Sequence, residues 1–564
     1  MGVVLDLADI QGNILAAYGK QGYPKARCIL LRVMGQDDEA RVKARRFVLE
    51  LLPQVTTALR WKDEKSDAPA AASNVFEVAR PMVTLNLAFT FYGLLALGVP
   101  TRTLRGMPDE FIDGMAKRAR MLGDDFVGAD WRDQWDVVWQ PTKGCPSAYI
   151  DEKTPHILVT LNAFVKASPS ALDETTRKIM AYAEKYGLRV LEGHNQTGKT
   201  TARYQDLSAI YKPDRDGVMQ ISPTEHFGFV DGISDPVFDG QDAEAAVKRE
   251  ARGNGAVDGE GNWRPLATGE FLLGYPDEAQ EVPGAAMPID FSRNGTFMAY
   301  RKLHQNVRAW NDFIDEQAGR FGKVRGIASK IEARETLIAK MAGRWSDGAP
   351  LAKAKDFAAW QVFRAKYPFR SPEWRREVVD YSYRDDPDGA TCPMTSHVRR
   401  TNPRDALDPW MNLQTPQTDK AAGSVLNNRR RILRRGLPYG AAEPDGSDKD
   451  EHGVVMMVVC SSLFRQFEFV QQQWVNYGLD ARAGNDTCPI VGNHSQGAAT
   501  PDEAARKRNG PKAKFVIPAA KDSSHPPFII EGVPQFIETR GGEYFFVPSL
   551  TALRMIGMGA VDPT

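Results

Sequence analysis

The order of strand-like and helix-like segments in the first 200 residues most constrains the fold. Four short apolar runs have the length and composition of strands, and two segments have helical spacing of apolar residues. In chain order these are strand 27–33, helix 38–59, strand 81–87, strand 156–161, helix 170–186 and strand 187–192. This order is that of a ferredoxin-like unit, in which helices cover one face of an antiparallel sheet. The sequence therefore predicts an α+β fold.

The second half repeats the pattern on a larger scale. Residues 296–303 and 453–460 are predicted strands, and residues 306–315 and 463–477 are predicted helices that follow them. A charged helical stretch at 318–345 and a long irregular region at 368–438 lie between them. At 564 residues the chain exceeds what a single core usually supports. We expect two ferredoxin-like domains, 1–240 and 241–564, with a helical insertion around 306–380.

Composition excludes several functional classes. Lys plus Arg and Asp plus Glu both total 72, so no net field attracts nucleic acid or a membrane surface. No apolar stretch reaches the ~20 residues of a membrane span, and Asp6 interrupts any signal-peptide core at the start. The five cysteines are scattered without a CxxC or CxxCH motif, which argues against covalent haem and disulfides. We expect a cytoplasmic protein.

His397 is the first candidate for metal chemistry. The chain has eight histidines, and no pair shows HxxxH or HExxH spacing. His397 is followed closely by Arg399, Arg400 and Arg404 in the segment CPMTSHVRRTNPR. An imidazole can serve as an axial ligand of haem iron, and guanidinium groups can neutralise haem propionates. The alternative is a hydrogen-bonded loop histidine beside solvated arginines.

Asp231 is the second candidate, in the pentad GFVDG. Gly228 and Gly232 allow a tight turn and close approach to a planar ligand. Apolar neighbours such as Phe229 and Ile233 are expected to desolvate the carboxylate and suit it to proton transfer. The alternative is an ordinary Asp-Gly turn.

Arg434 is the third candidate, in the segment RILRRGLPYG. The neighbouring run Arg429, Arg430 and Arg431 makes a surface phosphate-binding or targeting patch the competing interpretation. Interleaved apolar residues favour partial burial over a solvated basic tail.

A fourth motif indicates a different function. Residues 193–200, which include Gly193, Gly198, Lys199 and Thr200, match the G-x-x-x-x-G-K-[ST] phosphate loop. The segment that follows is a poor amphipathic helix broken at Pro213, and the upstream strands fit an antiparallel unit. Nucleotide binding is therefore the minor alternative.

Together these segments resemble the dye-decolorizing peroxidases over nearly the full length of the chain. The specific motifs are the GxxDG pentad, the CP-x3-H-x-R-x-TNPR segment and RILRRG-x-PYG, in that order. The start LDLADIQGNIL and residues 86–98, 270–275 and 343–345 are also similar to that family. The length and the N-terminal segment are most similar to the larger fungal and bacterial branch.

The resemblance implies a haem peroxidase that reduces hydrogen peroxide and oxidises dyes, phenols or other bulky donors by one-electron steps. It implies one non-covalent haem b per chain, held mainly by the C-terminal domain. His397 is then the proximal iron ligand, Asp231 the distal acid–base, and Arg434 the distal arginine, which also contacts the haem. We expect the remaining haem contacts to come from Gly232, Ile233, Ser234, Arg399 and Met456.

Some residues depart from the family pattern. Asp235 replaces the glutamine that commonly follows the pentad, and Val454 and Met456 occupy positions where relatives often carry Leu and Phe. The carboxylate that orients the proximal histidine is not evident; Asp480 and Asp486 are candidates. A non-catalytic haem-binding or transport protein remains the alternative, because it needs His397 but not Asp231 and Arg434 together.

Overall fold

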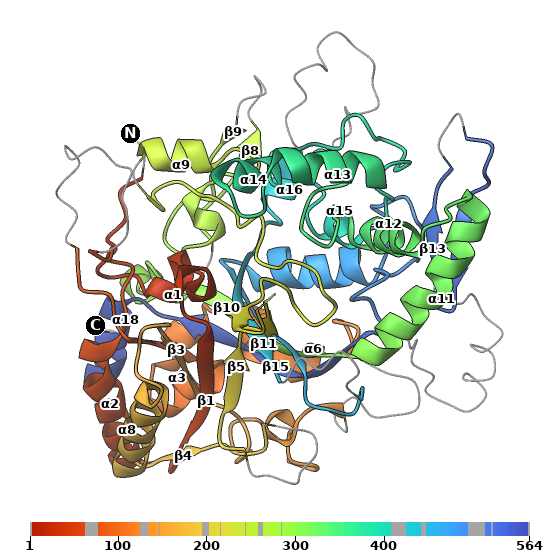
Figure 1. Cartoon of the computed structure of the whole chain (residues 1–564). Coiled ribbons are helices and arrows are strands. Elements are labelled where there is room, and N and C mark those ends of the chain that lie inside the picture. The colour runs from red at the N-terminus through yellow and green to blue at the C-terminus, as the bar shows by residue number, and fades with distance from the viewer. Residues whose placement is uncertain are drawn as a thin grey trace.

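We describe a computed structural model of the chain (Figure 1). It describes residues 3–62, 77–124, 134–145, 147–194, 202–214, 216–242, 244–257, 263–283, 285–407, 425–440, 447–494, 514–519 and 523–561. Residues 195–200 of the phosphate-loop motif lie outside these ranges. None of the helices within them is long and apolar enough for a transmembrane segment.

The first half forms the predicted ferredoxin-like sheet. Its strands are β1 (Lys25–Val33), β2 (Val83–Phe89), β3 (Ile157–Ala163) and β4 (Leu188–Val190). They lie in the order β2-β3-β1-β4, and the β1–β3, β2–β3 and β1–β4 pairs are all antiparallel. Helix α2 (Asp38–Leu51) follows β1, and α8 (Ala171–Lys185) connects β3 to β4. Figure 1 shows the two helices together on one side of this sheet.

The second half repeats the same strand order. Its strands are β10 (Thr296–Gln305), β11 (Leu433–Tyr439), β12 (Gly453–Cys460) and β15 (Ile537–Val547). They lie in the order β11-β12-β10-β15, again with antiparallel pairing. Strands β15 and β2 meet at the pair Phe546 and Phe89, which joins the two sheets into one. The α+β class with two ferredoxin-like units is confirmed, whereas the boundary at residue 240 stays a prediction.

Several helical segments lie between the strands of the second sheet in the chain. Helix α11 (Val307–Arg325) is followed by Gly326, whose left-handed backbone (φ 66°) stops the helix, and α12 (Lys330–Ala342) comes next. Two helices were predicted, at 306–315 and 318–345, with a break near residue 316. The observed break lies at residues 326–329 instead. The predicted helix 463–477 is instead two π-helical elements, η8 (Leu463–Glu468) and η9 (Val470–Val475), and it ends two residues early. Figure 1 shows α11, α12 and α13 (Phe357–Lys366) as a group away from α2 and α8.

The predicted irregular region at 368–438 is partly regular. It contains α14 (Pro372–Glu377), α15 (His397–Thr401), α16 (Val425–Asn428) and strand β11. His397 is the first residue of α15, and Arg434 lies on β11. The prediction of an irregular region was therefore wrong for the segments that carry His397 and Arg434.

The remaining elements are short. They are α1 (Gly12–Leu15), η1 (Tyr18–Gln21), η2 (Leu52–Gln54), α3 (Phe91–Ala96), α4 (Thr101–Leu104), α5 (Asp109–Asp113), α6 (Met115–Arg118), η4 (Val137–Trp139), β5 (Gln205–Ser208), β6 (Tyr211–Pro213), β7 (Met219–Ile221), α9 (Glu244–Glu250), β8 (Ala256–Val257), β9 (Trp263–Arg264), η5 (Thr268–Glu270), α10 (Ile289–Ser292), β13 (Lys514–Ile517), β14 (Phe528–Glu531) and α18 (Leu550–Met558).

Candidate active site

The structure brings seven of the eight predicted site residues to one cavity. The cavity has a volume of about 530 Å³, which is within the ~300–1,000 Å³ typical of ligand pockets. Most of its wall is apolar and comes from β10, β11, β12, η9 and the loops around residues 230 and 490. The predicted residues that line it are Asp231, Gly232, Ile233, Ser234, His397, Arg434 and Met456.

The pentad loop holds Asp231 in a fixed backbone conformation. Gly228 and Gly232 have φ angles of 95° and 76°, a region in which side chains are disfavoured, so the two glycines are required there. The Val230 amide donates to the Ser346 carbonyl (3.0 Å), and the Asp231 amide donates to the Pro223 carbonyl (3.1 Å). These bonds attach the loop to its neighbours on both sides of the carboxylate.

Arg434 pairs with Asp231 across the cavity wall. Its Nη1 lies 3.1 Å from Asp231 Oδ1, and its Nη2 donates to the Ile233 carbonyl (3.3 Å). Both residues line the cavity, with exposed fractions of 41% for the arginine side chain and 49% for the aspartate. The nearby Asp231 carboxylate raises the pKa of Arg434 above its usual value. The arrangement places a fixed positive charge beside a carboxylate at the cavity wall.

The apolar neighbours of Asp231 do not cover its carboxylate, contrary to expectation. Phe227 stacks on Trp310 of α11 with ring centroids 4.9 Å apart, and Phe229 packs edge-on against the same indole at 6.0 Å. The two rings stabilise the loop from behind.

Asp235 forms an ion pair beside the same cavity. Its Oδ2 lies 2.7 Å from Lys20 Nζ and 3.6 Å from Arg435 Nη1. Burial raises the pKa of Asp235, but Lys20 and Arg435 outweigh that effect, so the pKa lies below its ordinary value. The extra carboxylate noted in the sequence is therefore charged and paired.

Val454 and Met456 lie on the same face of β12. Both are half-buried while their neighbours Gly453, Val455 and Met457 are buried, as the two-residue period of a strand requires. Both also line the cavity.

His397 also lines the cavity, and its partner is a cysteine. Nδ1 of His397 lies 3.4 Å from Sγ of the buried Cys488. Among the residues that the structure describes, no carboxylate makes a hydrogen bond or ion pair with His397. Asp480 accepts from Trp474 Nε1 (3.0 Å), and the Asp486 carboxylate lies 3.6 Å from Lys514 Nζ. Neither of the two candidate carboxylates contacts this imidazole.

Arg399 is the predicted site residue that does not reach the cavity. Its Nη1 forms an ion pair with Asp386 (2.8 Å) and donates to the Cys392 carbonyl (2.7 Å). The guanidinium of Arg399 is buried among these partners, so it stabilises the position of residues 386–392 relative to α15. The geometry gives it no contact with a ligand in the cavity.

Arg344 and Arg431 line the cavity without having been predicted as site residues. Arg344 is 7% exposed and donates to the carbonyls of Gly348 and Val378. Burial, together with the nearby charge of Arg404, lowers the pKa of Arg431 to about 9. In the described part of the chain, neither Arg344 nor Arg431 has an acidic partner. Such a cationic wall suits an anionic ligand.

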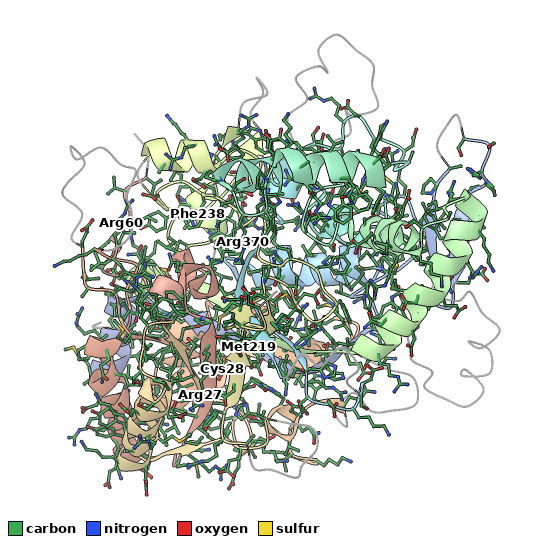
Figure 2. All side chains as sticks on the ribbon, in the orientation of Figure 1. Arg27, Cys28, Arg60, Met219, Phe238 and Arg370 are labelled. Atoms are coloured by element: carbon green, nitrogen blue, oxygen red, sulfur yellow. The ribbon has the colours of Figure 1, made fainter. Side chains whose placement is uncertain are left out.

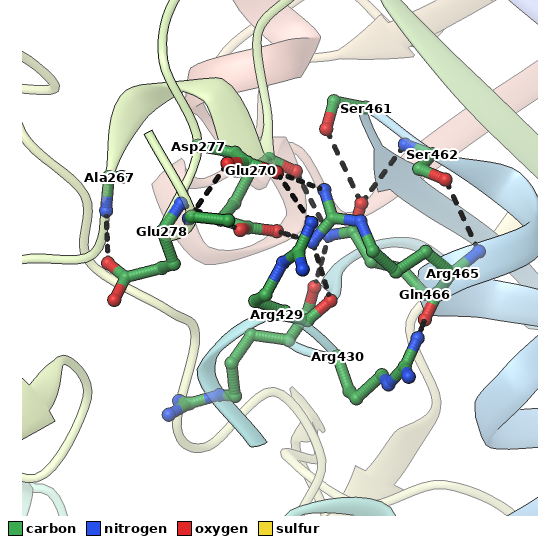
Figure 3. Close-up of polar contacts among 12 residues, drawn as sticks. Ala267, Glu270, Asp277, Glu278, Arg429, Arg430, Ser461, Ser462, Arg465 and Gln466 are labelled. Carbon is green, nitrogen blue, oxygen red and sulfur yellow. Dashed lines mark hydrogen bonds and ion pairs between the residues drawn. The ribbon is translucent and has the colours of Figure 1, made fainter. Parts of the chain in front are cut away.

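The run of arginines before Arg434 is not a solvated patch. Arg429 pairs with Asp277 (3.1 Å) and Glu281 (3.3 Å), while Arg430 lies over the ring of Phe469. Figure 3 shows Arg429 and Arg465 converging on Asp277 and Glu270. The surface phosphate-binding or targeting interpretation was therefore wrong.

The phosphate-loop alternative also lacks its structural context. A phosphate loop requires a helix whose N-terminus holds the phosphates. Here the residues after the motif form strand β5, which pairs with β1. At the start of the motif, the buried His194 accepts a hydrogen bond from Lys302 through its backbone carbonyl (2.7 Å). The described residues on either side therefore do not form a phosphate site.

Comparisons with known proteins place these observations in context. Residues 9–145 match the family model described as the DyP dimeric alpha+beta barrel domain. The chain is 27% identical over 490 residues to Peroxidase 2 of Mycetinis scorodonius, covering 84% of this chain and 76% of that protein. It is 30% identical over 346 residues to the multifunctional dye peroxidase DyP2 of Amycolatopsis sp. (strain ATCC 39116 / 75iv2), covering 59% of this chain and 61% of that protein. A solved dye-decolorizing peroxidase in complex with 2,6-dimethoxyphenol has the same fold, with a TM-score of 0.65, 23% identity, and coverage of 98% of this chain and 100% of that one.

Proposed function

Because the chain belongs to the dye-decolorizing peroxidase family, we propose that its cavity holds one non-covalent haem b and that His397 ligates the iron. The chain is a peroxidase, an oxidoreductase, and we propose that it reduces hydrogen peroxide with electrons from dyes, phenols or other bulky organic donors. The observation that carries the proposal is that His397, Asp231 and Arg434 line one cavity.

The residues present fit this cofactor. The cavity wall is mainly apolar, as a porphyrin requires, and it contains one imidazole whose Nδ1 already has a partner. Nε2 of His397 is therefore the nitrogen available to iron. Arg344 and Arg431 lack acidic partners among the described residues, and they would hold the propionates. His397, Arg344 and Arg431 all follow residue 240, which supports the proposal that the C-terminal half holds most of the haem.

The reaction places specific demands on the side chains. Haem supplies the iron at which peroxide is reduced and to which donors pass electrons one at a time. Asp231 would accept the proton from one peroxide oxygen and return it to the other, directly or through a water molecule. Arg434 would hold that carboxylate in place through the 3.1 Å contact and stabilise the negative charge that develops as the O–O bond breaks.

The Asp231–Arg434 pair also bears on the alternative of a non-catalytic haem carrier. A carrier needs an axial ligand and an apolar cavity, but it does not need an acid–base group. The Asp231–Arg434 pair at the cavity wall supplies such a group, which a carrier would have no use for. The pair therefore favours catalysis over storage or transport.

The test is an Asp231→Asn variant, with Asp239→Asn as the control because Asp239 follows in the same segment but lies outside the cavity. We expect Asp231→Asn to bind haem normally and to react with peroxide at least ~100-fold more slowly, as loss of a general acid–base predicts. Stopped-flow absorption after mixing with peroxide measures this rate. An undiminished rate in Asp231→Asn would remove Asp231 from the role.

A further inference from the structure

The contact between His397 and Cys488 has no counterpart in the sequence motifs. His397 begins α15, whereas Cys488 lies 91 residues later in the loop after η9. The exposed fraction of Cys488 is 0%, so its thiol is shielded from bulk solvent. The two side chains meet with Nδ1 and Sγ 3.4 Å apart, an ordinary distance for a hydrogen bond to sulfur.

The backbone around Cys488 holds the sulfur in place. The Cys488 amide donates to the Val475 carbonyl (2.7 Å), and the Cys488 carbonyl accepts from the Gly492 amide (3.0 Å). A side chain on Gly492 would collide with the Cys488 backbone, because an added Cβ would lie 2.6 Å from the carbonyl oxygen. The tight turn at Gly492 therefore maintains the position of Cys488 relative to η9. Element η9 in turn packs against α15.

We propose that Cys488 is the positioning residue for the axial imidazole and accepts the Nδ1–H hydrogen bond of His397 in place of a carboxylate. This inference rests on the proposed haem function. If Nε2 donates its lone pair to iron, the neutral ring carries its proton on Nδ1, so Nδ1 must donate and Sγ must accept. Partners of this kind fix the ring orientation and tune the basicity of the ligand.

A sulfur acceptor has a different effect from a carboxylate. Sulfur of a thiol is a weak acceptor, whereas an ionised carboxylate is a strong one. A weaker acceptor draws the Nδ1 proton less, so the imidazole donates less charge to iron. The chain should therefore have a weaker iron–histidine bond and a more easily reduced iron than a Cys488→Asp variant of itself.

Resonance Raman spectroscopy of the ferrous, haem-loaded protein tests this directly through the iron–histidine stretching band. We expect Cys488→Asp to raise the band frequency and to make the haem harder to reduce. We expect Cys488→Ala to lower the frequency and to weaken haem affinity about tenfold, as loss of such a partner commonly does. The matched control is Cys28→Ala, since Cys28 is also buried but lies on β1 in the other sheet (Figure 2).

The outcomes separate this inference from the function on which it rests. If the unmodified protein shows no iron–histidine band, His397 is not the ligand and the proposed function fails. If the band is present and does not move in folded Cys488→Asp and Cys488→Ala proteins, Cys488 has no positioning role. Circular dichroism of each variant establishes folding, and an isosteric Cys488→Ser variant provides the same comparison if Cys488→Ala does not fold.

Discussion

The guanidinium of Arg434 on β11 lies 3.1 Å from the carboxylate of Asp231, which is 203 positions earlier in the chain. The contact joins a turn that precedes the second sheet to the edge strand of that sheet. A catalytic pair assembled from such distant segments depends on the whole fold, and its two members should act as one unit.

That dependence predicts non-additive kinetics. Asp231→Asn and Arg434→Leu should each slow the peroxide reaction by at least ~100-fold, and the double variant should be little slower than the worse single variant. Stopped-flow rates for the four proteins give the coupling free energy. Fully additive effects would show that the two residues act independently despite their contact.

Arg344 should matter for haem binding rather than for catalysis. Replacing this buried guanidinium by Gln should weaken haem affinity by about 10- to 100-fold, the loss of roughly 1.5–3 kcal/mol from a charge-assisted hydrogen bond. Titration of the apoprotein with haem measures the affinity. The control is Arg375→Gln, an exposed arginine on α14 that lies outside the cavity. Equal affinities in both variants would argue against a propionate at Arg344.

Asp235 should influence which donors are preferred. Asp235→Asn removes one negative charge from the cavity wall and leaves Lys20 and Arg435 without that partner. The KM for sulfonated, anionic dyes should fall by about two- to fivefold, which corresponds to roughly 0.5–1 kcal/mol, while a neutral phenol should be little affected. The difference should shrink at high salt. A uniform change for both donors would indicate a structural effect instead.

Buried histidines should limit stability in acid. Burial, together with the charge of the adjacent Arg32, lowers the pKa of His156 to about 3, and Arg32 Nη1 donates a hydrogen bond to the neutral ring at Nε2 (2.8 Å). A histidine in the unfolded chain has a pKa near ~6.5. Between pH ~3 and pH ~6.5, the unfolded chain therefore carries a proton on His156 and the folded chain does not. The contribution of His156 to the free energy of unfolding is therefore fully present above pH ~6.5 and is lost as the pH falls below that value.

The corresponding measurement is chemical denaturation at pH 7 and pH 5. His156→Gln should reduce the loss of unfolding free energy between the two pH values by about 2 kcal/mol. His525→Gln is the matched control, because His525 is exposed. The same pH dependence in His156→Gln and the unmodified protein would contradict the account.

The sequence predicted β1 to β4 of the first half and β10 and β12 of the second, because these strands have clear apolar patterns, but it did not predict the central strand β15, whose pattern is interrupted by Gly541 and Gly542. Residues 453–460 formed β12 with the expected bounds. Strand β11 was missed because Gly436 and Pro438 interrupt its pattern. The structure accommodates Pro438 because β11 is the edge strand, where a missing backbone N–H on the open side costs nothing.

The candidate site was predicted where a motif was local and missed where it was not. Asp231, His397 and Arg434 lie in compact motifs, so their neighbours in sequence indicated them. Cys488 carries no such signal, since only the path through η9 brings it to His397. Arg344 lies in the segment 343–345, whose sequence is similar to the dye-decolorizing peroxidases. The position of Arg344 at the cavity wall depends on its packing against Tyr381, which the sequence does not show. The prediction of Arg399 as a haem contact was wrong because its ion pair with the buried Asp386 is a tertiary contact that the motif does not indicate.

The most direct test of the central claim is the absorption spectrum of purified His397→Gly beside that of the unmodified protein. The account predicts that the unmodified protein carries one haem with a Soret band, that His397→Gly loses this band or its axial nitrogen signature, and that added imidazole restores it. A haem spectrum unchanged by the substitution would contradict the assignment of His397 as the iron ligand.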